Sequence, residues 1–344
     1  SKGLVQDLMR VTPDSTRIYI KEGAKGVKGG FAIGGFNESK GYLGSFMSLT
    51  PENYFIGHES GENNTKGLYN SFIGYQAGKS NTTGSKNVFL GYQSGFSNLE
   101  ASDNVFIGNQ SGYKTTTGYG NIYIGLNSGH ENTDGFGNSF VGYGSGYNNN
   151  ANYNSFFGFN AGYNNTSGQY NVFLGYCSGF SNQNGGNNIF LGNYSGYGNM
   201  SGIRNIMIGY FTGRSNQNGS YNIFLGDQTG YYNTSANYNV FLGYQSGYYN
   251  TYGGITGDEG SYNTLVGYMS GYNNRKGYNN VMLGYKTGYS NTNGKNNVFL
   301  GYESGKANTI GESNVFIGYQ SGFYNTSGYR NIFIGEQSGY NNTN

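Results

Sequence analysis

The chain has 344 residues, of which only 10% are charged, and its 19 basic and 17 acidic residues give a formal net charge of +2. This balance leaves no cationic footprint for nucleic acid or for an anionic membrane surface. No stretch of about 18 apolar residues is present, so no transmembrane helix is expected. Glycine is abundant, with 64 copies, but aromatic residues reach 17%, whereas disordered chains are poor in them. We therefore expect a folded protein that neither binds nucleic acid nor inserts into a membrane.

The first 50 residues differ from the rest of the chain. The two prolines, at 13 and 51, each precede a short run of β-forming residues, at 16–20 and 54–57. Proline is tolerated at the start of a strand, so both runs are predicted strands. Residues 30–35 resemble a degenerate copy of the phrase that is repeated later. We expect residues 1–50 to be an N-terminal β region with longer, irregular coils that leads into a repeat array over 51–344.

The array is built from one nine-residue phrase, Asn-(Val/Ile/Ser/Thr)-Phe-(Ile/Leu)-Gly-Tyr-Gln-Ser-Gly. It occurs 17 times, first at 53–61 and last at 331–339. Of the 16 intervals between the central glycines, 14 are 17 residues long, one is 16 and one is 24. A strict period of this size is typical of solenoids, in which each repeat stacks on the last. The sequence predicts an all-β, parallel β-solenoid (a β-roll or β-helix) of about 17 coils.

Positions within the repeat are numbered from one, the first Asn, to seventeen. The short run of β-formers at positions two to four favours a strand over positions one to four, with a second short strand at six to eight or ten to twelve. Glycine occupies positions five and nine in all 17 copies, which suits corners with positive φ. Asparagine occupies position one throughout and position twelve in every copy except Thr115. Repeated asparagine favours turns and amide ladders between coils.

Successive strand residues point to opposite sides, so positions two and four share one side and position three has the other. We expect positions two and four to fill the coil and the phenylalanine at position three to point outward. The resulting stripe would be about 80 Å long, and monomers rarely expose so large an apolar patch. We therefore predict that this column is buried against identical chains. Its residues are Phe55, Phe72, Phe89, Phe106, Phe140, Phe173, Phe190, Phe224, Phe241, Phe299, Phe316 and Phe333.

Tyrosine recurs at position six. An aromatic ring has an apolar face and a polar tip, so such a column could stabilise the stacked coils or contact surface glycans or a neighbouring fibre. The structural interpretation is favoured, and glycans stay a candidate partner. The residues are Tyr75, Tyr92, Tyr143, Tyr176, Tyr244, Tyr285 and Tyr319.

The residues of common catalytic and metal-binding motifs are missing. His58 and His130 occupy positions where tyrosine is usual, and we interpret them as drift. Cys177, the only cysteine, stands where glutamine is commonest and is interpreted as a drifted surface position. No zinc-binding, dithiol, nucleophile-triad or phosphate-loop pattern occurs. We predict no catalytic, cofactor-binding or metal-binding residue, no cofactor and no enzymatic activity.

The segment Asn-Ser-Phe-Ile-Gly-Tyr-Gln-Ala-Gly at 70–78 resembles the head repeat of trimeric autotransporter adhesins. Over 53–344 the chain is also similar to the glycine- and asparagine-rich repeat regions of bacterial surface and tail-fibre-like proteins. The adhesin resemblance implies a left-handed parallel β-roll in a homotrimer. Two departures are the longer coil and the phenylalanine that stands where the family has alanine.

These observations lead to one functional expectation. The chain is predicted to be an extracellular or bacterial cell-surface protein with a structural or adhesive role. Identical chains are the expected partners, with a homotrimer as first expectation and an end-to-end filament as an extension of it. The alternatives are a carbohydrate-binding solenoid and the shaft of a phage-type tail fibre.

Overall fold

The computed structural model describes residues 9–12, 15–18, 31–37, 41–253 and 257–343. Near the N-terminus, β1 (Met9–Thr12) pairs antiparallel with β2 (Ser15–Ile18). Next, β3 (Phe31–Asn37) pairs antiparallel with β4 (Gly41–Leu49). The described strands of this region therefore form hairpins instead of the long coils expected. Of the strand predicted at 16–20, residues 16–18 lie in β2 and residues 19 and 20 lie outside the described ranges.

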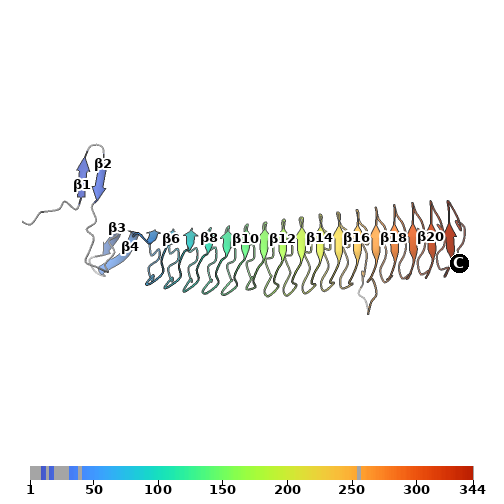
Figure 1. Ribbon diagram of the computed structural model, residues 1–344, viewed down its shortest axis with the longest axis horizontal. Coiled ribbons are helices and arrows are strands. Elements are labelled where there is room, and N and C mark those ends of the chain that lie inside the picture. Colours follow the sequence, from blue (N-terminus) through green and yellow to red (C-terminus); the bar gives the residue numbers. More distant parts are fainter. Residues whose placement is uncertain (1–8, 13–14, 19–30, 38–40, 254–256, 344) are drawn as a thin grey trace, which may run out of the picture.

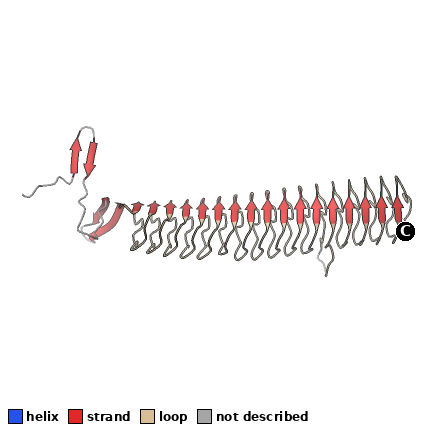
Figure 2. Cartoon of the chain, viewed as in Figure 1, coloured by secondary structure: helices blue, strands red, loops and turns tan. Residues whose placement is uncertain are grey.

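The repeat array begins where β4 pairs antiparallel with β5, and from β5 onward each strand pairs parallel with the next. Equivalent positions face each other, as Phe72 faces Phe89. Figures 1 and 2 show the coils stacked side by side in a rod, with one strand of each coil along a single face. The predicted parallel β-solenoid is confirmed. Its strands are β5 (Asn53–Ile56), β6 (Asn70–Ile73), β7 (Val88–Leu90), β8 (Val105–Ile107), β9 (Ile122–Ile124), β10 (Ser139–Val141), β11 (Ser155–Phe157), β12 (Val172–Leu174), β13 (Ile189–Leu191), β14 (Ile206–Ile208), β15 (Ile223–Leu225), β16 (Val240–Leu242), β17 (Thr264–Val266), β18 (Val281–Leu283), β19 (Val298–Leu300), β20 (Val315–Ile317) and β21 (Ile332–Ile334).

The rest of each coil consists of turns. In the array, over residues 53–253 and 257–343, each coil has one strand, and the predicted second strand is absent. The turns are nevertheless bonded from coil to coil. The Gly78 N–H donates to the Ser94 carbonyl at 2.9 Å, and the Gln93 N–H donates to the Tyr75 carbonyl at 2.8 Å. Backbone hydrogen bonds thus hold the coils together all the way around.

The phenylalanine column lies inside the coil, so the predicted outward orientation is wrong. Stacked rings form the core, as Phe156 and Phe173 do with centroids 4.7 Å apart and planes 4° from parallel. Because these rings are covered by their own coil, they cannot form a lateral contact with another chain. The corrected residues are Phe72, Phe89, Phe106, Phe140, Phe173, Phe190, Phe224, Phe241, Phe299 and Phe316, all 0% exposed, with Phe55 at 9% and Phe333 partly buried.

The interior of the coil is too narrow for more than one large side chain. A Cβ on the position-nine Gly179, where φ is +59°, would lie 2.5 Å from the Phe173 ring. A Cβ on the position-five Gly175, where φ is +132°, would lie 2.6 Å from the Gly192 carbonyl oxygen of the next coil. Both predicted glycine corners are therefore confirmed, and each also clears space that a side chain would occupy.

Asparagine lines the remaining interior and forms the predicted ladders. At position one, the Asn171 Nδ2 donates to the Gly185 carbonyl at 2.9 Å, while its Oδ1 accepts the Asn188 backbone N–H at 2.9 Å. At position twelve, the Asn216 Nδ2 donates to the Asn199 Oδ1 at 2.8 Å. Buried amides are costly unless they are hydrogen-bonded, and the stacking of identical coils supplies partners for most of them; exceptions include the Asn239 Nδ2 and the Asn308 Oδ1.

One interruption of the position-twelve ladder is compensated by a second substitution. Thr115 replaces the asparagine, and it leaves its own Oγ1 and the Asn98 Oδ1 buried without a hydrogen-bond partner. In the next coil, Tyr123 replaces the usual phenylalanine, and its hydroxyl accepts a hydrogen bond from the Asn132 Nδ2. The tyrosine hydroxyl thus takes the place of the missing amide oxygen. Burial raises the pKa of Tyr123, so this hydroxyl stays protonated.

Candidate interaction surface

The outward side chains of positions two and four on β5–β21 form a continuous surface, here called the strand face. Val88 and Leu90 are 41% and 43% exposed, while the Phe89 between them is fully buried. Position four is apolar in all 17 coils. Position two is mostly Val or Ile, with a few small polar residues such as Ser71. Large apolar side chains on a regular sheet surface are thus accessible along the whole array.

The position-six tyrosines stand beside the strand face and stack along the rod. Tyr75 and Tyr92 have ring centroids 5.4 Å apart and planes 7° from parallel. Tyr143, Tyr176, Tyr244, Tyr285 and Tyr319 occupy the same column and are 38–45% exposed. Tyr75 and Tyr285 have a stacked aromatic ring on both faces. The other five stand at the ends of aromatic runs and have a stacked ring on one face only. Stacking on a sugar needs a free ring face, so the tyrosines with both faces covered offer glycans only their edges and hydroxyls.

Both histidines stand in aromatic columns. His58 stacks on Tyr75 with centroids 5.3 Å apart. His130 lies between Tyr113 and Tyr147, at 5.0 and 4.9 Å, and its Nδ1 is 2.8 Å from a Glu131 carboxylate oxygen. Burial lowers the pKa of His130. Each histidine thus replaces tyrosine as a stacking ring.

Charged side chains outside the strands pair mainly with each other. The Lys79 Nζ lies 2.5 Å from a Glu59 carboxylate oxygen, and the hydrogen bonds from Lys79 and Gln76 lower the pKa of Glu59. The Lys114 Nζ likewise lies 2.5 Å from Glu131. Such exposed pairs contribute little stability, and they leave no concentrated charge along the rod.

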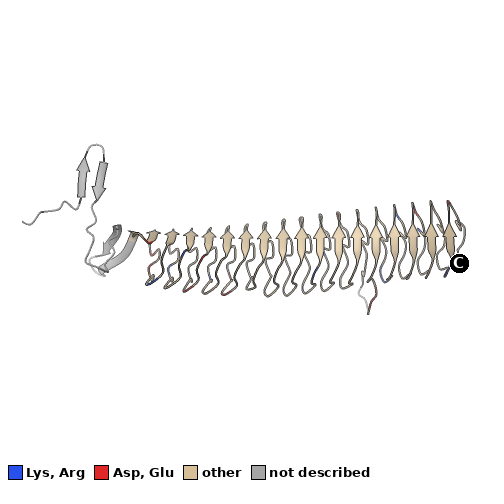
Figure 3. Cartoon of the chain, viewed as in Figure 1, with Lys and Arg blue, Asp and Glu red and all other residues tan. Residues whose placement is uncertain are grey.

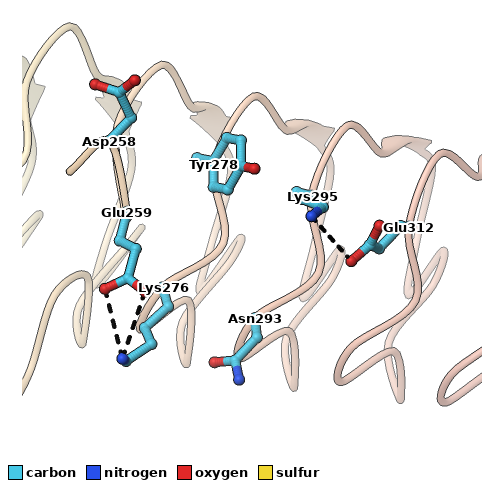
Figure 4. Close-up of a pocket in the computed structure, with 7 residues that line it drawn as sticks. All are labelled: Asp258, Glu259, Lys276, Tyr278, Asn293, Lys295 and Glu312. Atoms are coloured by element: carbon cyan, nitrogen blue, oxygen red, sulfur yellow. Dashed lines mark hydrogen bonds and ion pairs between the residues drawn. The ribbon is translucent and has the colours of Figure 1, made fainter. Parts of the chain in front are cut away.

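The inserted segment near residue 258 borders a pocket of about 600 Å³. Figure 4 shows Lys276 directed toward Glu259 and Lys295 directed toward Glu312. The nitrogen–oxygen distances are 3.5 and 3.3 Å. Opposite charges therefore engage one another within the pocket. The lining residues are Asp258, Glu259, Lys276, Tyr278, Asn293, Lys295 and Glu312.

Cys177 is buried instead of lying on the surface as predicted. Burial raises the pKa of its thiol, which keeps the sulfur protonated and unreactive. Among the described residues, no group of three or more His, Cys, Asp or Glu side chains is placed to hold a metal ion. The described part of the chain also contains no helix long and apolar enough to span a bilayer.

The strand face is what the sequence reasoning missed, because that reasoning placed positions two and four inside the coil. A signal was present in the repeat itself. Position two accepts Ser71, Ser139 and Ser155, whereas position three is apolar in every coil except that of Tyr123. A polar residue is tolerated more readily on the outside. Figure 3 shows the strands of the array free of charged residues.

Comparison of the chain with protein-family models, with curated protein sequences and with solved structures gives no match.

Proposed function

We propose that this chain is a structural and adhesive protein of the bacterial exterior, a stiff rod that acts through its shape and its surface. The observation that carries the proposal is the stacking of coils over residues 53–253 and 257–343. Strands and turns bond to their equivalents in the next coil, and most of the buried amides and core rings bond or stack in the same way. A solenoid of this kind is extended along one axis and presents the same surface many times.

The mechanism is passive. Neighbouring coils are joined by backbone hydrogen bonds around the whole circumference, as at Gly78 and Gln93, and by the ring stack in the centre. Separating two coils breaks these contacts together, so the rod resists bending and extension. The low charge and the repeated apolar surface support a role in contacts between large assemblies over a role in binding small ions.

Carbohydrate binding is the weaker candidate. The stacked tyrosines leave hydroxyl groups at the surface but cover one or both of the ring faces that a sugar would need. A tail-fibre shaft would have the same rod structure as a surface fibre. The two differ in location, on phage particles or on the cell exterior. Localisation therefore distinguishes the remaining alternatives.

Electron microscopy tests the proposal. The purified chain is expected to form rods with an array about 80 Å long, from 17 strands at about 4.8 Å each. Antibodies raised against the chain are expected to label spikes or filaments outside intact cells of the source. Compact particles in place of rods, or label confined to the cell interior, would overturn the proposal. Label on phage particles would favour the tail-fibre shaft.

A further inference from the structure

The strand face is apolar and almost uncharged over its full length. Of the chain's 36 charged residues, 24 lie in residues 53–344, and none of these stands at position two or four. The adjoining position six has only two, Asp227 and Glu336. Charged residues are therefore confined to the turns, while the sheet surface is kept free of them.

The strand face is also large. Seventeen strands at about 4.8 Å cover about 80 Å, and the strand face together with the adjoining position-six column is about 13 Å wide, which gives about 1,000 Å². The largest apolar patch on a typical monomer is about 300–600 Å². A stable complex buries about 800 Å² per partner. Together, the strand face and the mainly apolar position-six column are thus larger than the patch a monomer usually exposes and sufficient for a stable interface.

Resting on the proposed rod, we infer that the strand face is buried against the strand face of a second copy of this chain. The reason is its period. The side chains of Val172 and Leu174 recur at the spacing of hydrogen-bonded strands, as the pairing of β12 with β13 shows. A partner that keeps contact along the whole face needs the same spacing, and an identical ladder has it. Two sheet faces pack about 10 Å apart with interdigitated side chains.

Other partners fit the strand face less well. A polyanion needs basic residues, and positions two and four have none. Surface anchors of membranes combine apolar residues with Lys, Arg and Trp, and this chain contains no Trp. Position two also places small residues, Ser71, Ser139 and Ser155, among the larger ones. Such small side chains leave hollows that the larger residues of a facing sheet can enter.

The experiment compares three forms of the full chain by sedimentation velocity and light scattering. The face variant has Leu90→Lys, Leu174→Lys and Leu283→Lys, all at exposed position-four sites. The matched control has Thr83→Lys, Thr117→Lys and Asn184→Lys at position fourteen, an exposed turn position where the chain itself has Lys66 and Lys276. Both variants add the same charge, so a difference in their association shows the effect of placing the charge on the strand face.

The wild type and the control are expected to have a mass of at least twice 37.3 kDa at micromolar concentration. In the face variant, facing lysines repel one another, and association is expected to weaken by about 100-fold or more. Circular dichroism should show the same β-structure content in all three forms, and electron microscopy should show rods in all three. If the lysine variant misfolds, a variant with threonine at the same three sites is used in its place, because threonine favours strands.

Wild-type chain that forms rods but stays monomeric at about 50 µM, a concentration in the range of the Kd of weak complexes, would overturn this inference. The proposed rod would be unaffected. Equal association of the face variant and the control would also overturn it. Monomeric wild-type chain that sediments with neutral lipid vesicles would assign the strand face to a membrane surface instead. Absence of rods would contradict the proposed function itself, so the two failures are distinguishable.

Discussion

The two sides of each strand have similar composition and opposite surroundings. In β12, Phe173 is fully buried, while Val172 and Leu174 beside it are 39% and 51% exposed. All three are apolar β-formers, so hydrophobicity does not separate them. The inner side of β12 holds the Phe173 ring, which lies against Gly179, and the amide of Asn171 at position one. In a coil this thin, the core uses one apolar column, and the second apolar surface is left exposed.

The largest expected effect comes from truncating an inner and an outer apolar side chain of the same strand to alanine. Phe173→Ala removes a ring stacked on both neighbours and should lower the free energy of unfolding by about 3–5 kcal/mol. Leu174→Ala removes a half-exposed side chain and should cost about 1 kcal/mol or less. Denaturant unfolding of the two variants, at protein concentrations tenfold apart, separates folding from association. Equal losses in the two variants would contradict the assignment of inner and outer columns.

A smaller effect tests whether the Tyr123 hydroxyl replaces the amide that Thr115 lacks in the position-twelve ladder. Tyr123→Phe alone removes the hydroxyl that Asn132 contacts, and Thr115→Asn alone places an amide against that hydroxyl. Each should destabilise the fold by about 1–2 kcal/mol. The double variant restores the arrangement of the other coils and gives the Asn98 Oδ1 a partner, so it should be close to the wild type or more stable.

Denaturant unfolding of the four forms gives the coupling energy, which should be on the order of 1–3 kcal/mol and favourable. Simple additivity of the two single substitutions would show that the residues at positions three and twelve are independent. Phe106→Tyr is a matched control, because the preceding coil has its position-twelve asparagine, Asn98. This substitution should only destabilise the fold.

The smallest effect concerns the half-buried position-ten column. Burial lowers the pKa of His130 below its usual value near 6.5. The unfolded chain then binds a proton at higher pH than the folded chain does, so stability falls as the pH decreases below about 6.5. The hydrogen bonds from Lys114 and His130 outweigh burial and lower the pKa of Glu131, which adds a loss only near pH 4.5 and below.

Thermal unfolding between pH 7.5 and pH 5 measures the histidine contribution. His130→Tyr installs the residue of the neighbouring coils, Tyr113 and Tyr147, and should flatten this part of the profile. A profile that is unchanged by the substitution would show that His130 does not titrate differently in the folded chain.

Part of the backbone conformation was predictable and part was not. Positive φ at Gly175 and Gly179 follows from invariant glycine in the repeat. Positions seven and seventeen are also left-handed, as at Gln76 with φ of 54° and Tyr170 with φ of 59°. Neither residue type favours that conformation, which costs about 1–2 kcal/mol. Hydrogen bonds from the neighbouring coil compensate, as the Gln76 N–H donates to the His58 carbonyl at 2.8 Å.

The amino-acid sequence by itself determined the period, the strand in each repeat, the glycine corners and the asparagine ladders. These follow from local chemistry repeated at one spacing, so no knowledge of distant contacts was needed. Only the tertiary structure decided which side of the strand is inside. Alternation divides a strand into two sides but does not say which way the chain turns after it. The turn places Gly179 beneath Phe173, and the space left there admits one ring and excludes Val172 and Leu174.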